Sequence, residues 1–340
     1  MFKRVLPALT LCFLSLPAAA QTAADTPPPV AAPVLEEAEP VPQTVLVTGS
    51  RPGPGLWKVS KGENVMWVFG TYSPLPPNME WRSRNVEKII ASSQEYLKPP
   101  ASAAGVGVMG GLGALPFLIG FKKNPDGAEL KDVLPPDVYA RWLPLKQQYF
   151  NDDDIEHNRP IFVAEQLSHR AMKAAGLAGR SYDVRKTIEK LVEKHNIKTT
   201  SSLHRVEIKD PGKALREFKK SPMDDAACLV QTMARLETNI EVMRARANAW
   251  AVGELDEIRK LDFSERDACY DAVNASSLAK KQPELRDMKV LAAAKWIANA
   301  EKALATNAST FAVVEIRDIL DPKGVIATLQ AKGYTVEPPK

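Results

Sequence analysis

The stretch Trp67–Pro76, WVFGTYSPLP, contains the pattern that decides the fold. Its apolar start ends at Gly70, and the polar cluster Thr71-Tyr72-Ser73 follows before the prolines. A buried strand that ends in a polar loop delivers side chains to a sheet edge, where ligand sites are often built. The sequence therefore predicts a strand over 65–69 and a candidate site in the loop after it.

The segments around this stretch predict a β-loop-α-β unit. Residues 56–59 and 65–69 are two strand-like runs separated by a short polar turn, which is typical of a hairpin. After the loop, residues 81–93 have the apolar spacing of a helix, and Glu95–Leu97 is predicted as the next strand.

The C-terminal end repeats this arrangement. Thr310–Ile316 is predicted as a buried strand, Val325–Ala331 as a helix capped by Gly333, and 334–336 as a last short strand. Between the two ends, helical spacing dominates over 161–175, 184–195, 226–252 and 285–305, with a possible strand at 197–201 and a surface turn and short helix in 205–221. The predicted fold class is α/β (α+β): a central β-sheet built from two β-loop-α-β units at the chain ends, with a large helical middle.

The N-terminus predicts export. Lys3 and Arg4 precede an apolar run that is too short to span a bilayer, and Ala18–Ala20 provides small residues for cleavage. We expect a Sec-type signal peptide over 1–20, cleaved after Ala20, and a periplasmic or secreted protein. Residues 21–50 are predicted to be a disordered linker rich in proline and alanine, and 51–340 to be the folded domain.

Composition excludes several classes of function. The net charge of +4 falls to +2 when Lys3 and Arg4 leave with the signal peptide, and no basic stripe indicates nucleic-acid binding. No segment after the signal peptide is a transmembrane segment, because the apolar run Ala104–Gly120 is broken by glycines and a proline.

Two cysteines remain after cleavage, Cys228 and Cys269. An even pair in an oxidising compartment indicates one disulfide, and the alternative is two buried free thiols. A bridge that closes a loop of about 40 residues contributes roughly 3–4 kcal/mol in the chain-entropy model.

Several motifs do not support a specific chemistry. The spacing of Gly105, Gly107 and Gly110 matches a dinucleotide-binding pattern, but no buried strand is predicted before it, so a flexible apolar loop is the better interpretation. The acidic cluster at 152–154 lacks the alternation of a calcium loop. No two of the four histidines have the i, i+4 spacing of a helical zinc site. Ser73 is not in a Gly-x-Ser-x-Gly nucleophile elbow.

Three stretches resemble the TraB/GumN family, which is similar to the Tiki metalloproteases and the erythromycin-esterase-like proteins. They are VMWVFGTYSPLP, WRSRNVEKIIASSQEYL and STFAVVEIRDILDPKGVIATLQAKGYTVEP, and the resemblance runs from about Gly55 to Pro338. The family's architecture implies that the loops after the two end strands face each other across one cleft.

The chain departs from the family at the residues that carry its chemistry. The family has a Gly-x-x-His motif at each end of the domain, and Ser73 stands at the position of the first histidine. At the second motif, Glu315 stands at the glycine and Asp318 at the histidine, while Lys98 and Pro99 occupy the neighbourhood of a family glutamate. Serine is a poor ligand for zinc or manganese, and two acids alone make a weak site.

These departures lead to two functional hypotheses. The first is a non-catalytic binding or scaffold protein on a degenerate metal-hydrolase fold, without a cofactor, whose partner is an unknown periplasmic protein or peptide. The alternative is a metal-dependent hydrolase or peptidase with an altered site at Asp318 and Glu315, which would take a divalent metal such as Mn or Zn. The related metalloproteases imply a possible homodimer. The predicted binding residues are Gly70, Thr71, Tyr72, Ser73, Glu315, Arg317 and Asp318, with no metal ligand and no assigned catalytic residue.

Overall fold

The structure is a computed structural model that describes residues 53–81, 84–106, 116–151, 154–179, 181–221, 223–260 and 267–339. The predicted signal peptide and linker, residues 1–50, lie outside the described residues. Residues 53–339 belong to one compact unit of the chain.

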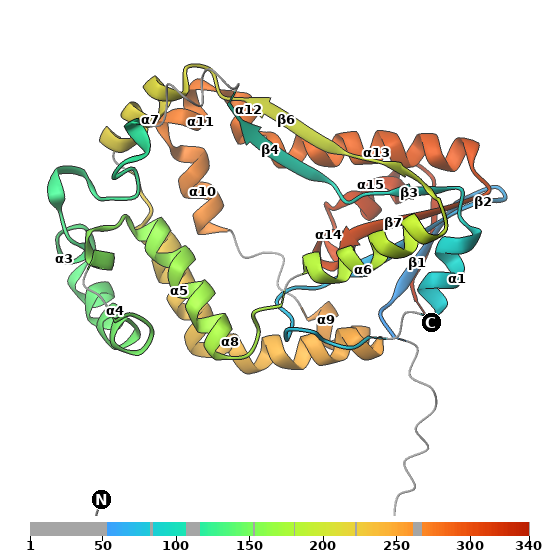
Figure 1. The fold of residues 1–340 in the computed structure, drawn as a ribbon, viewed down its shortest axis with the longest axis horizontal. Coiled ribbons are helices and arrows are strands. Elements are labelled where there is room, and N and C mark those ends of the chain that lie inside the picture. Colours follow the sequence, from blue (N-terminus) through green and yellow to red (C-terminus); the bar gives the residue numbers. More distant parts are fainter. Residues whose placement is uncertain are drawn as a thin grey trace, which may run out of the picture. The chain divides into compact units, whose positions relative to one another are not determined.

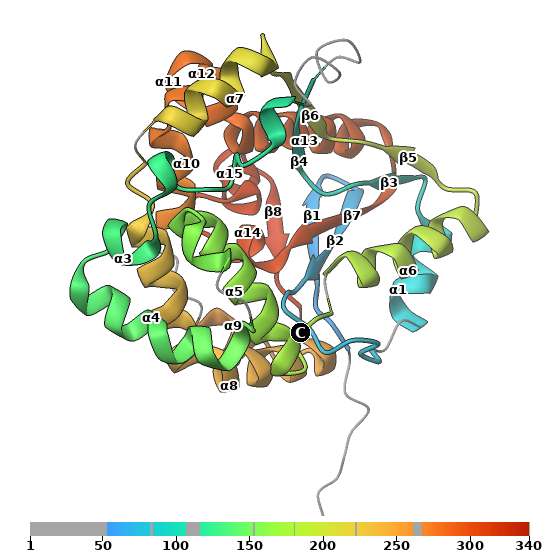
Figure 2. The same cartoon turned by 60° about the vertical axis from the view of Figure 1, so that its left-hand side comes forward.

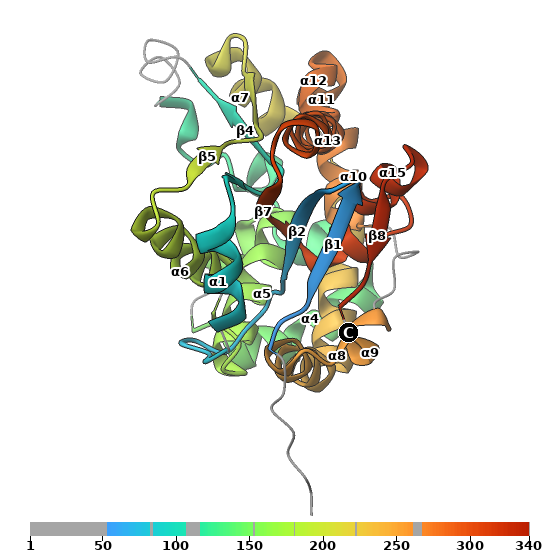
Figure 3. The same cartoon turned by 90° about the vertical axis from the view of Figure 1, so that its right-hand side faces the viewer.

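A six-stranded mixed sheet forms the centre of this unit, with the strand order β5-β3-β7-β2-β1-β8. Its strands, in chain order, are β1 (Leu56–Lys61), β2 (Asn64–Thr71), β3 (Glu95–Leu97), β5 (Lys198–Thr200), β7 (Ser309–Glu315) and β8 (Thr335–Glu337). β1 and β2 form the predicted antiparallel hairpin, and β7 lies parallel to both β2 and β3. The strands from the two chain ends are therefore neighbours in one sheet, as Figure 3 shows.

Helices cover both faces of the sheet (Figure 3). They are α13 (Met288–Thr306) and α15 (Val325–Ala331) on one face, and α1 (Arg84–Ser92) and α6 (Ser181–Lys194) on the other. The core between them is apolar, because alternate strand residues point to opposite faces and both faces carry apolar side chains. Phe69 and Phe311 contact each other on one face, and Val68 and Ala312 are fully buried on the other.

A second hydrophobic core lies in the helical middle of the chain. Its helices are α3 (Leu130–Val133), α4 (Pro136–Tyr149), α5 (Pro160–Ala174) and the first half of α8 (Ala226–Val252). The second half of α8 joins the sheet core through Ala247 and Trp250. In Figures 1 and 2, α5 lies between α4 and the sheet.

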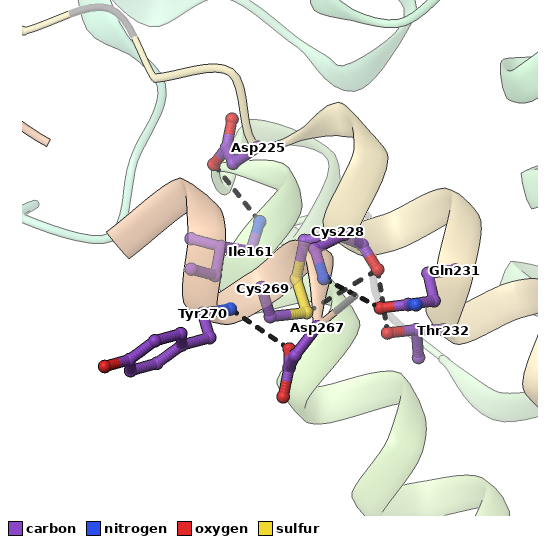
Figure 4. Close-up of a disulfide and its surroundings, with 9 residues drawn as sticks. Ile161, Asp225, Cys228, Gln231, Thr232, Asp267, Cys269 and Tyr270 are labelled. Carbon is purple, nitrogen blue, oxygen red and sulfur yellow. Dashed lines mark hydrogen bonds between the residues drawn. A yellow bond between two sulfur atoms is a disulfide. The ribbon is translucent and has the colours of Figure 1, made fainter. Parts of the chain in front are cut away.

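The predicted disulfide is present, and it joins α8 to α10 (Ala268–Ala275). The sulfurs of Cys228 and Cys269 are 2.00 Å apart, and Cys228 is fully buried in the second core. Figure 4 shows hydrogen bonds around the bridge, including the one that caps α10, from the backbone N–H of Tyr270 to Asp267 Oδ1 (3.0 Å). The bridge thus fixes the start of α10 against α8.

A separate pair of parallel strands was not predicted from the sequence. β4 (Ala101–Gly105) pairs with β6 (Leu203–Glu207), and α13 packs against both. The prediction that 205–221 begins with a surface turn was therefore wrong for its first residues, although the helix α7 (Pro211–Lys220) follows. β4 has small side chains without an apolar alternation, so only the pairing with β6 identifies it as a strand.

The structure also bears on two further predictions, which concern the glycine pattern at 105–110 and transmembrane segments. β4 leads directly into Gly105 of the dinucleotide-like pattern, but most of its residues are exposed, and residues 107–110 lie outside the described ones. Among the helices that the structure describes, none combines the length and the hydropathy that a membrane crossing requires.

Candidate functional site

The first candidate loop begins where β2 ends. The indole Nε1 of Trp250 donates a hydrogen bond to the carbonyl oxygen of Gly70 (2.7 Å), and Thr71 Oγ1 donates to the carbonyl oxygen of Val314 on β7 (3.4 Å). Thr71 is 1% exposed, so its hydroxyl is occupied in holding the two strands together.

Tyr72 is also buried, and only Ser73 of the polar cluster is exposed. Burial raises the pKa of the Tyr72 phenol to about 12, against the opposing effect of Arg246, so the phenol stays protonated at neutral pH. Ser73 precedes a cis peptide bond to Pro74, and its side chain opens to solvent. Ser73 is therefore the residue of this cluster that is available to a ligand.

The second candidate loop begins at the adjacent strand. Glu315 is exposed at the end of β7, and α14 (Ile316–Leu320) follows with Arg317 and Asp318 in its first turn. Burial, together with the nearby charge of Glu315, raises the pKa of the Asp318 carboxyl to about 6, although Lys289 on α13 opposes the shift. Asp318 is therefore partly protonated near neutral pH.

The two candidate loops begin side by side at the ends of β2 and β7 and then lie near different helices. Thr71 and Glu315 are partners in the parallel register of β2 and β7. Beyond this point, Asp318 has Lys289 of α13 among its electrostatic neighbours, whereas Ser73 lines a pocket against α5. Glu315 and Asp318 line neither the pocket beside Ser73 nor the pocket between residues 75–81 and α6. That both loops bind one ligand stays a prediction.

The pocket beside Ser73 has a volume of about 680 Å³. One wall is α5, and the other is formed by Ser73-Pro74 and the segment 177–179 that follows α5. Leu75 N–H donates to the carbonyl oxygen of Gly179 (3.0 Å), which holds the first loop against that segment. A volume of this size suits a small organic ligand or a short peptide.

Charged and polar side chains from α5 face this pocket. Arg170 is fixed by a hydrogen bond from Nη1 to the carbonyl oxygen of Tyr149 (2.9 Å) and by the ring of Phe150, 4.4 Å from its guanidinium carbon. The side chains of five other polar lining residues make no hydrogen bond or ion pair within the described part of the chain: Ser73, Glu165, Gln166, Ser168 and His169. The pocket thus presents hydrogen-bonding groups that the protein itself does not use.

The sequence does contain one indication of the α5 wall of this pocket, a pair of polar residues at helical spacing. The pair alone does not predict a binding site. Glu165 and His169 are four residues apart, so they project from the same face of α5. The pair contains only one histidine, so it does not match the His–His spacing of a helical zinc site. Its nearness to Ser73 arises from the fold, since the two segments are far apart in the sequence.

The donor groups of the candidate site do not fit the metal that the family resemblance implies. Zinc and manganese sites combine several imidazole, carboxylate or thiolate ligands around one ion. Within the described residues, no group of three or more His, Cys, Asp and Glu side chains is arranged to hold a metal ion. Asp318 and Glu315 therefore remain a pair of acids without an imidazole partner.

Asp318→Asn is expected to stabilise the protein at pH 8 and to leave its stability at pH 4 nearly unchanged. The folded-state pKa of about 6 exceeds the ordinary value of 3.8, so the carboxyl favours folding below pH 4 and loses this contribution as the pH rises through 6. The gain at pH 8 is about 1–3 kcal/mol, reduced by solvent screening. Urea unfolding at both pH values measures it, with Asp256→Asn at an exposed carboxylate as control. Equal effects at pH 4 and pH 8 would contradict the prediction.

The comparisons with known proteins give one match. The model of the TraB/PrgY/gumN family matches residues 55–338. No curated protein and no solved structure matches the chain.

Proposed function

Because the chain belongs to the TraB/PrgY/gumN family, we propose that it is a non-catalytic binding protein whose site is the pocket beside Ser73. The observation that carries this proposal is the pocket of about 680 Å³, in which Ser73 faces unused polar groups of α5. The family's histidine positions hold Ser73 and Asp318 instead, and these residues do not line a common pocket among those described.

A short peptide with free termini is the ligand that these groups favour. Glu165 presents a carboxylate to an ammonium group, and Arg170 presents a fixed guanidinium to a carboxylate. The half-buried Met172 adds apolar surface for a side chain between the two charged ends. We also propose that the protein is periplasmic or secreted. The disulfide is consistent with an oxidising compartment, and the predicted signal peptide would direct the chain to one.

Native mass spectrometry of the purified protein with an equimolar mixture of tripeptides tests this function. The wild type is expected to retain intact tripeptides. Ser73→Trp should abolish retention, because the indole would occupy the pocket, while Ser92→Trp at an exposed position of α1 should not. Glu165→Gln should lower the affinity about tenfold or more, because the acceptor of the ligand's ammonium group loses its negative charge. Equal retention by Ser73→Trp and the wild type would refute the pocket as the site.

A hydrolase with an altered site, in which Asp318 and Glu315 act as a general acid–base pair, is the second candidate. The observation that favours it is the Asp318 pKa of about 6, which suits a general acid or base near neutral pH. The test supplies Mn²⁺, Co²⁺ or Zn²⁺ and measures bound metal together with peptide and ester hydrolysis. Stoichiometric metal, or hydrolysis that Asp318→Ala abolishes, would overturn the binding-protein proposal in favour of this one.

A further inference from the structure

A separate exposed surface combines apolar and basic side chains around α7. We call it the α7 surface and define it as Val106, residues 116–120 and α7. Three large apolar side chains are exposed here, and Ile119 is the most exposed of them at 77%. The other two are Val106 and Leu118. In Figure 1, α7 lies beside α11 (Ser277–Lys281), near the end of β4.

Two contacts attach the apolar segment 116–120 to α7. Lys219 Nζ donates a hydrogen bond to the carbonyl oxygen of Ile119 (2.9 Å), and the guanidinium carbon of Arg216 lies 4.8 Å from the ring centroid of Phe117. Both anchoring groups come from the helix, so the segment is held at its backbone and at Phe117. The side chains of Leu118 and Ile119 remain turned to solvent.

The helix itself is fixed at both ends. Asp210 caps its N-terminus by accepting a hydrogen bond from the backbone N–H of Lys213 (3.1 Å). At the other end, Arg159 Nη2 donates to the carbonyl oxygens of Phe218, Lys219 and Ser221 at 2.9–3.0 Å. Arg159 is 2% exposed, so this anchor is built into the interior. The α7 surface is therefore a supported feature of the fold.

The charges of the α7 surface are mostly positive. Within 209–220 there are five cationic residues and two acids. Asp210 is used in the cap, and Glu217 pairs with Lys281 of α11 at 2.7 Å. Lys213 and Lys220 are exposed and form no ion pair within the described part of the chain. The surface thus offers exposed ammonium groups together with exposed aliphatic side chains.

We propose that the α7 surface binds the surface of an anionic phospholipid bilayer. Aliphatic side chains enter the headgroup region of a bilayer, while lysines extend their ammonium groups to lipid phosphates. Each lysine near an anionic membrane contributes about 1 kcal/mol, so a few of them with two or three apolar residues give reversible binding. The charge complementarity, together with the exposure of Leu118 and Ile119, favours this occupant. The surface shares no residue with the pocket beside Ser73.

Vesicle co-sedimentation tests the proposal. It uses the protein in the processed form that is isolated from the expressing cells. Binding is expected to vesicles of equal parts phosphatidylglycerol and phosphatidylcholine, to fall as NaCl is raised, and to be much weaker with phosphatidylcholine alone. Leu118→Ser/Ile119→Ser and Lys213→Glu/Lys220→Glu should each lower the partition coefficient by at least about tenfold. Thermal unfolding checks that each variant folds. If the Leu118→Ser/Ile119→Ser variant is unstable, the Lys213→Glu/Lys220→Glu variant alone tests the proposal.

Matched variants away from α7 control for general effects. Val242→Ser/Leu143→Ser removes two exposed apolar side chains from α8 and α4, and Lys173→Glu/Lys302→Glu reverses two exposed charges on α5 and α13. Both control pairs should bind vesicles as the wild type does. Three results would overturn the proposal: no binding to anionic vesicles, equal binding to neutral ones, or equal losses in the control pairs.

Discussion

Gly324→Ala is expected to destabilise the folded protein by about 3 kcal/mol or more, because the new methyl group has no space. An ideal Cβ at Gly324 would lie 2.1 Å from the backbone carbonyl oxygen of Asp318 and 3.0 Å from that of Asp321. The φ of −77° at Gly324 is available to any residue, so the cost is steric and does not come from backbone conformation.

The surroundings of Gly324 leave no inexpensive way to relieve this clash. The N–H of Gly324 donates to the carbonyl oxygen of Asp321 (2.8 Å), and its own carbonyl accepts from the backbone N–H of Thr328 (3.0 Å). Moving the start of α15 away from α14 would break the first bond and would unpack α15 from the sheet core. Val325 and Leu329, two of its apolar residues, are almost fully buried there.

Urea unfolding followed by tryptophan fluorescence measures the effect of Gly324→Ala. The matched control is Gly105→Ala, because nothing lies within 4 Å of an ideal Cβ at Gly105 and its φ lies outside the left-handed region. We expect the control to change the free energy of unfolding by less than about 0.5 kcal/mol. A Gly324→Ala variant within the same margin would show that the turn between α14 and α15 is looser than the structure indicates.

The family resemblance and the fold were predictable because their signals are local. The strand β2 followed by a polar loop, and the β7 strand followed by Gly324 and α15, are each complete within some 25 residues of sequence. Parallel pairing of β2 with β7 follows when two similar units enter one sheet. The hairpin of β1 and β2 likewise needed only alternation and a turn.

The candidate site was less predictable because its parts meet only in the folded chain. Ser73 was identified from its strand, but the α5 wall of its pocket is about 90 residues away in sequence. The Asp318 pKa depends on burial and on Lys289 of α13, neither of which the sequence displays. β4 was missed for a similar reason, since its pairing with β6 overrides a weak intrinsic strand signal.

Removal of the Cys228–Cys269 bridge is expected to cost about 4 kcal/mol of stability. The bridged residues are 41 apart in sequence, and cross-linking removes the entropy of a loop of this length from the unfolded chain. Without the bridge, the contact between α10 and α8 depends on the remaining noncovalent contacts around Cys228. A hydrogen bond from the backbone N–H of Ala268 to Gln231 Oε1 (3.0 Å) is one of these.

The measurement compares Cys228→Ala/Cys269→Ala with the wild type in urea, with and without reductant. Reductant should lower the unfolding midpoint of the wild type toward that of the double variant and should leave the variant unchanged. Thiol titration of the denatured wild type should rise by two groups on reduction, whether or not Cys12 is retained in the purified chain. An unchanged thiol count, or a wild-type midpoint insensitive to reductant, would contradict the prediction. The insensitivity would mean that contacts of α10, and not the covalent loop, hold this part of the chain together.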